Sequence, residues 1–171
     1  MQLLELGSIR TWGDLDPGDL FALSLDGKPN LGLKLHGEED GDEYFSCAVL
    51  SAGLDGYEAS PTYVVDSVPR SRALLHLPNA KLVPGANLQE LSFSDDGASL
   101  KAGDLVYTEE GLHLVLQGDR SHRFAVRVAD GEIASGLGAK HAIIPSWCVV
   151  VPGSKEPETI FRWPPEAKKQ A

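Results

Sequence analysis

Two short stretches decide how this chain folds: Leu15-Asp16-Pro17-Gly18-Asp19-Leu20-Phe21 and Leu100-Lys101-Ala102-Gly103-Asp104-Leu105-Val106. Each places a Gly-Asp pair directly before apolar residues. The glycine can take a positive φ in a turn, and the aspartate side chain can hydrogen-bond turn amides and start a strand. The two stretches therefore predict one kind of turn, used twice, each leading into a β-strand.

The residues after each stretch also correspond. Apolar side chains alternate with polar ones, which is the period of a half-buried strand. The first half has Leu31, Leu33 and Leu35, then Phe45, Cys47 and Val49, then Val-Pro-Gly at 83–85; the second has Leu112, Leu114 and Leu116, then Phe124, Val126 and Val128, then Val-Pro-Gly at 151–153. We interpret this order as an internal repeat. A unit this short cannot easily bury a core alone, so we expect the halves to pack together.

Strands rather than helices are predicted along the whole chain. The 18 Gly and 11 Pro are spread throughout, and both destabilise a helix interior. Further strands are predicted at 19–25, 44–50, 62–66, 73–77, 88–93, 104–108, 142–144 and 147–151. We expect an all-β protein with little or no helix, in which two related small antiparallel barrels pack together. The expected parts are a first repeat (1–85), a connecting segment (86–99), a second repeat (100–153) and an extended C-terminal tail (154–171).

Two resemblances bear on these units. The pattern Leu-x-x-Gly-Asp-Leu-hydrophobic resembles the start of a strand in SH3-like and KOW-type small barrels, and it implies architecture only. Arg70-Ser71-Arg72, followed by Ser94-Asp95-Asp96-Gly97, resembles the PilZ domains, which bind a cyclic dinucleotide. That second resemblance implies nucleotide sensing as one alternative function.

Composition narrows the class of protein. The chain has 171 residues and a mass of 18.3 kDa, enough for one domain or two very small ones. No run approaches the roughly 18 apolar residues of a membrane helix, and the first residues lack the pattern of a signal peptide. Cys47 and Cys148 are too few for a disulfide scaffold. We expect a soluble, cytoplasmic protein in which both cysteines serve as small core side chains.

The acidic charge is confined to one part of the chain. The formal net charge is −10; residues 1–66 hold 13 acidic and 3 basic side chains, and residues 67–171 hold 12 of each. Nucleic acids and anionic membranes attract clustered Lys and Arg, so we expect neither as a partner. A basic protein is a compatible partner, and solubility is the simpler explanation. The densest acidic cluster, a candidate partner-binding site, is Glu38, Glu39, Asp40, Asp42 and Glu43.

Large apolar residues occur in the proline-rich tail: Ile160, Phe161 and Trp163. We expect them to dock on their own domain, as large apolar residues usually do. The alternative is that they bind a protein partner or a second copy of the chain, and a homodimer is compatible with exposed strand edges. They are therefore kept as candidate partner-binding residues.

A basic spot occurs in the second half at Arg120, Arg123 and Arg127. Arginine suits carboxylate and phosphate recognition, so these three residues are a candidate anion-binding site. The interpretation we favour is that they pair with the acidic first half across neighbouring strands.

No motif for catalysis, metal binding or cofactor binding is present. The spacings of zinc ligands, a nucleophile elbow and a phosphate loop are all missing, so we expect no cofactor, no metal and no catalytic residue. The five histidines are dispersed, with His36 and His113 predicted on the polar faces of their strands. The leading hypothesis is a non-catalytic module that binds another protein, as regulatory or immunity-type proteins do. The alternative is a small hydrolase in the cleft between repeats, with candidate residues His113, His122, His141, Asp104 and Asp119.

Overall fold

The chain is built from β-strands. The computed structural model describes residues 7–25, 28–36, 44–51, 61–67, 71–85, 92–94, 100–118, 122–137, 141–153 and 156–164. Within these ranges the only helix is one short 3₁₀ turn, η2 (Trp12–Asp14). The expected all-β class is confirmed. Across the same ranges, no helix has the length and apolar character needed to cross a membrane.

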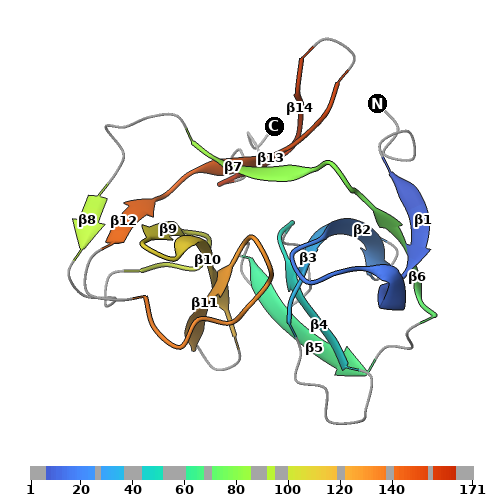
Figure 1. The fold of residues 1–171 in the computed structure, drawn as a ribbon, viewed down its shortest axis with the longest axis horizontal. Coiled ribbons are helices and arrows are strands. Elements are labelled where there is room, and N and C mark those ends of the chain that lie inside the picture. The colour runs from blue at the N-terminus through green and yellow to red at the C-terminus, as the bar shows by residue number, and fades with distance from the viewer. Residues whose placement is uncertain are drawn as a thin grey trace, which may run out of the picture.

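The strands follow one order in both halves of the chain (Figure 1). The first half contains β1 (Ser8–Thr11), β2 (Leu20–Leu25), β3 (Lys28–Lys34), β4 (Tyr44–Val49), β5 (Thr62–Ser67), β6 (Ala73–His76) and β7 (Lys81–Pro84). The second contains β8 (Ser92–Ser94), β9 (Leu105–Thr108), β10 (Gly111–Gln117), β11 (Arg123–Arg127), β12 (His141–Ile144), β13 (Trp147–Val151) and β14 (Glu158–Trp163). Hydrogen-bonded neighbours run β1-β6-β2-β3-β4 in the first half and β8-β12-β9-β10-β11 in the second, and β5 is an additional strand that pairs with β4.

The predicted turn is present in both halves with the same geometry. Gly18 has a φ of 93° and Gly103 a φ of 95°, which confirms the need for glycine at each position. The same two hydrogen bonds form in each half. In the first half Gly18 N donates to Lys34 O (2.9 Å) and Asp16 N to Asp19 Oδ2 (2.8 Å). In the second half Gly103 N donates to Val115 O (2.8 Å) and Lys101 N to Asp104 Oδ2 (2.7 Å). Each aspartate thus fixes the turn that leads into β2 or β9.

One hydrophobic core is shared by the two halves, as expected. Both rows of alternating leucines point into it, and the strands β6, β12 and β13 complete it. Its buried residues are Leu20, Leu31, Leu33, Leu35, Ala48, Leu50, Leu75, Leu77, Leu82, Leu105, Leu114, Leu116, Val126, Ile144, Trp147 and Val149. Burial of apolar surface from both halves in one cluster stabilises their association.

The opposite faces of the strands are covered too, which the alternation did not predict. In the first half Trp12 and Phe21 lie in a second cluster with Cys47 and Val49, and Phe21 covers Gly32 of β3. In the second half a smaller cluster contains Leu100, Val106, Val115 and Ile143. The prediction of a solvent-facing His113 is therefore wrong: its side chain is 1% exposed because both faces of β10 are packed.

No sheet closes into a barrel within the described residues. The strand that ends each half, β7 or β13, leaves its own half, and the two pair with each other in a separate sheet with β14. The edge of β5 is also partly occupied, since Thr62 pairs in parallel with Gln117 of β10. The pairing of β7 with β13 thus joins the two halves.

The expected alignment of the two halves is offset by one residue at strands β4 and β11. Lys34 pairs with Cys47 in the first half, and its counterpart Val115 pairs with Ala125 in the second. Cys47 therefore corresponds to Ala125 and not to Val126. A slip of one residue exchanges the two faces of a strand, which is why Cys47 lies in the cluster of the first half and Val126 in the shared core.

The C-terminal segment docks on its own chain as strand β14. It pairs antiparallel with β13, with a bulge between Val149 and Val150. Phe161 lies 5.5 Å and Trp163 6.2 Å from Trp147, measured between ring centroids. The docking expected for this segment is confirmed by these contacts.

Candidate binding surface and cavity

Two exposed aromatic side chains flank Ala142 at one end of the large sheet. Phe93 of β8 and Tyr107 of β9 both pair in register with Ala142 of β12, so all three side chains lie on one face. Phe93 is 80% exposed and Tyr107 is 60% exposed. We call these three residues the β8 surface. Strand β8 ends the strand order of this sheet and lies at the opposite end of the molecule from β1 (Figure 1).

The first half has a corresponding row with a different character. Ile9 of β1 pairs with Leu75 of β6, and Leu75 pairs with Ala22 of β2. Ile9 is exposed, but Leu75 is buried in the shared core, and alanine takes the place of Tyr107. The exposed aromatic pair is therefore specific to the second half.

A cavity of about 330 Å³ opens on the other face of the second half. Its apolar wall includes Leu100, Val115, Ala125 and Leu137, and the polar side chains Arg123, Ser135 and His141 also line it. His141 is 4% exposed, and neither of its ring nitrogens has a hydrogen-bond partner among the described residues. We call this the His141 cavity.

The position of His141 corresponds to Leu74 in the first half. Ile143 pairs with Val106 as His76 pairs with Phe21, and His141 and Leu74 each lie two residues before on their strand. Leu74 packs in a cluster with Trp12 and Phe21, whose rings meet edge to face at 5.6 Å. In the second half Val106 replaces Phe21 and Ala125 replaces Cys47. Of these two smaller side chains, Ala125 lines the cavity.

Arg123 contributes a positive charge to the His141 cavity. Its guanidinium donates a hydrogen bond to the carbonyl oxygen of Leu100. No carboxylate of the described residues lies within ion-pair distance of it. Burial raises the pKa of the nearby Asp104 carboxyl. The hydrogen bond from the Lys101 amide and the charges of Lys101 and Arg123 partly offset this rise. Asp104 itself is engaged in the turn.

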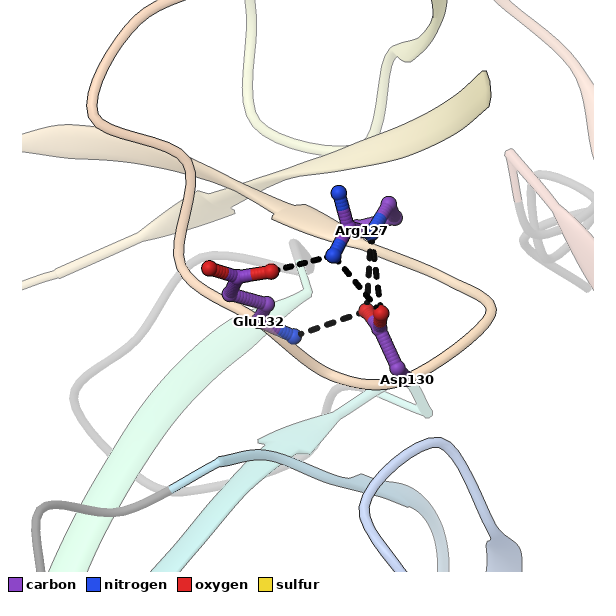
Figure 2. Close-up of polar contacts among 3 residues, drawn as sticks. All are labelled: Arg127, Asp130 and Glu132. Atoms are coloured by element: carbon purple, nitrogen blue, oxygen red, sulfur yellow. Dashed lines mark hydrogen bonds and ion pairs between the residues drawn. The ribbon is translucent and has the colours of Figure 1, made fainter. Parts of the chain in front are cut away.

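A second cavity of about 320 Å³ adjoins the first, sharing Ala134 and Ser135. Arg127 lines it and donates hydrogen bonds to two carboxylates, Asp130 and Glu132, as Figure 2 shows. Its Nε donates to both oxygens of Asp130 at 3.0 Å, and its Nη2 donates to Asp130 Oδ2 at 2.7 Å. Hydrogen bonding to Asp130 raises the pKa of Arg127, and the same bond lowers the pKa of Asp130. The positive charge of Arg127 is therefore offset by these two carboxylates.

The predicted anion-binding arginines are therefore separated. Arg127 has two carboxylate partners, and they come from the loop after β11 and not from the acidic first half, so that predicted pairing is wrong for Arg127. Arg123 faces the His141 cavity, and Arg120 lies outside the described residues. Arg123 and Arg127 both lie on the face of β11 opposite the shared core, as the alternation predicted.

The predicted partner-binding residues divide in the same way. Ile160, Phe161 and Trp163 are half-buried against the shared core. Glu38, Glu39, Asp40, Asp42 and Glu43 lie outside the described residues, as do Asp119 and the PilZ-like residues Arg70, Asp95, Asp96 and Gly97.

Of the residues named for a hydrolase, those within the described ranges are not brought together. His113 Nδ1 donates to the carbonyl oxygen of Gly111 at 3.2 Å, and His122 is exposed. His113 and His141 line different cavities. In the described ranges, a histidine does approach a carboxylate where His76 Nε2 lies 3.5 Å from Asp19 Oδ2, without hydrogen-bond geometry. No cavity described above includes that pair.

Sequence reasoning missed the β8 surface because Phe93 falls in the segment assigned as a connector. The signal was present: 88–93 was predicted as a strand, and a strand between two repeats needs a neighbour to pair with.

No family model matches this chain, and no curated protein or solved structure was found to match it.

Proposed function

We propose that this chain is a non-catalytic binding module that recognises another protein through the β8 surface. The observation that carries the proposal is the exposure of Phe93 and Tyr107 on either side of Ala142. Adjacent exposed aromatic side chains mark interaction sites, and tyrosine is common among residues that dominate binding energy. An edge strand such as β8 can also accept a strand from a partner. The half-buried Phe161 and Trp163 are less suited to this role.

The charge of the chain supports a basic partner. With a net charge of −10, the protein attracts cationic proteins over distances comparable to the Debye length. We propose that the acidic cluster at 38–43 contributes to this attraction, while the β8 surface provides the contact. A second copy of the chain is the alternative partner.

The architecture proposed for the module is a duplication of one SH3-like unit. Support comes from the matching strand order, from the matching turns at Gly18 and Gly103, and from the pairing of β7 with β13. We propose that the second unit begins at β8, which corresponds to β1. A cytoplasmic location remains part of the proposal, and the two free cysteines, Cys47 and Cys148, agree with a reducing compartment.

The proposal is tested by quantitative capture from a lysate of the native organism. The variant F93S/Y107S removes both aromatic side chains from exposed positions, so it is expected to fold normally. The matched control is I9S, which removes an exposed apolar side chain from the corresponding edge strand β1. We expect wild type and I9S to enrich the same protein, and F93S/Y107S to lose it by roughly tenfold or more. Equal enrichment by F93S/Y107S overturns the proposal.

Point variants are preferable to removal of the tail. Deleting the residues after 153 would take away β14 and uncover Trp147, so a lost partner could reflect a damaged core. Analytical ultracentrifugation of wild type and F93S/Y107S identifies the alternative partner: concentration-dependent dimerisation that the double variant abolishes would assign the β8 surface to a second copy.

A further inference from the structure

We propose that the His141 cavity binds a small organic carboxylate that carries an apolar group. This site is independent of the β8 surface, which lies on the other face of β12. At about 330 Å³ the cavity is at the small end of the range of roughly 300–1,000 Å³ typical of ligand pockets. Three observations support the proposed binding.

The first observation is the buried imidazole of His141. A polar group removed from water without a hydrogen-bond partner is costly to the fold, so native proteins keep few of them. His141 is 4% exposed, lines the cavity, and has both ring nitrogens unpaired among the described residues. A bound group that accepts or donates a hydrogen bond in the cavity removes this cost.

The second observation is the contrast between the two halves. At the place of His141 the first half has Leu74, packed among aromatic and aliphatic side chains. The second half has both a polar residue and empty space there. A histidine that replaced leucine only as a packing residue would need a polar neighbour within the protein. The cavity instead leaves room for that neighbour to be a ligand.

The third observation fixes the chemical class. Arg123 faces the same cavity from β11, and its bond to the carbonyl oxygen of Leu100 leaves most of its N–H donors without a partner among the described residues. A guanidinium and an imidazole together suit a carboxylate, which accepts hydrogen bonds from both. Leu100, Val115 and Leu137 form an apolar wall that suits an aromatic or branched aliphatic group. The two features together point to a carboxylic acid of modest size.

The test is a titration followed by NMR of the histidine ring protons. The probes are sodium benzoate and sodium 3-methylbutanoate, with benzamide as the uncharged counterpart of benzoate. H141L identifies the His141 signal by its absence, and leucine is the residue that the first half already has at this position. We expect at least one carboxylate to shift the His141 signal saturably, and benzamide to bind more weakly.

Two variants separate binding in the cavity from binding elsewhere. R123Q removes the charge and is expected to weaken binding by roughly tenfold or more, as for loss of a charge-assisted hydrogen bond. H122Q changes an exposed histidine and is expected to bind as wild type does. Failure of both carboxylates to shift the His141 signal overturns the proposal. Binding can also be followed at the methyl groups of Val115, and affinities there that are the same in R123Q, H141L and wild type would overturn it as well.

Discussion

The ring of Trp163 lies directly over Gly103: a Cβ placed on this glycine would be 2.2 Å from the ring. The corresponding Gly18 is covered differently, by the backbone of Ala129, whose oxygen would be 2.5 Å from such a Cβ. Each of the two matching turns is thus closed by a segment from elsewhere in the chain. The first is closed by the loop after β11 and the second by β14.

This packing predicts how glycine substitutions rank. Gly111→Ala meets no atom within 4 Å, so its cost comes only from a φ of 117° and is expected to be about 1–2 kcal/mol. Gly103→Ala has a similar φ and must also displace Trp163, so it is expected to destabilise more. Gly136→Ala, in open space without a positive φ, is the neutral control. Urea denaturation checks the order, and an equal loss for Gly103→Ala and Gly111→Ala would contradict it.

A buried hydrogen bond ties β13 to the same turn. Trp147 is 2% exposed and its Nε1 donates to the carbonyl oxygen of Gly103 at 2.7 Å. Trp147→Phe keeps an aromatic ring but leaves that carbonyl without the donor, so we expect a loss of about 1–3 kcal/mol in unfolding free energy. Gly103 should show faster amide exchange in the variant. Wild-type stability for Trp147→Phe would mean that this bond contributes little.

Exchange of one residue between the halves tests the cost of the unpaired imidazole. Without added carboxylate, His141→Leu is expected to raise the unfolding free energy by about 1–2 kcal/mol, because a buried polar group without a partner is removed. Leu74→His makes the reverse change in a packed cluster and is expected to destabilise by about 1–3 kcal/mol. Denaturation curves of the two variants measure both effects. Destabilisation by His141→Leu would show that the histidine has a partner within the protein.

The ion pair of Arg127 predicts a dependence on pH. The pKa of Asp130 is lowered in the folded state, chiefly by the hydrogen bond from Arg127. The stabilisation is therefore fully present above the unfolded pKa of about 3.9 and is lost as the pH falls through the lower folded value. Wild type is expected to exceed Asp130→Asn in stability at neutral pH and to lose that advantage in acid. The difference should be small and reduced by salt, because both side chains are partly exposed.

The control for this comparison is Glu109→Gln, which changes an exposed carboxylate in the turn between β9 and β10. Its stability difference from wild type is expected to vary little over the same range of pH. If wild type stays more stable than Asp130→Asn in acid, the stabilisation does not depend on the charge of Asp130, which would contradict the prediction.

Local patterns predicted much of this fold. The turns at Gly18 and Gly103 and the rows of alternating leucines follow from short-range rules, because turn sterics and strand period depend on neighbouring residues. The predicted strands that lie in described ranges are present. The strands that were missed, β1, β7 and β14, are short or lie beside proline, and they form because a neighbouring strand is available.

The arrangement of the strands could not be predicted from such patterns. The pairing of β7 with β13 depends on contacts between residues far apart in the chain. The burial of His113 also depends on what covers the second face of β10. The contrast between His141 and Leu74 depends on the pairing of β12 with β9 and of β6 with β2, which local patterns do not specify.

The central claim, recognition of a protein through the β8 surface, is tested most directly by hydrogen–deuterium exchange of the full chain with and without the captured partner. The account predicts slower exchange in β8 and β12, at residues 92–94 and 141–144, with β1 unchanged. Protection confined to β1 or β14, with β8 and β12 exchanging as in the unbound chain, would contradict it.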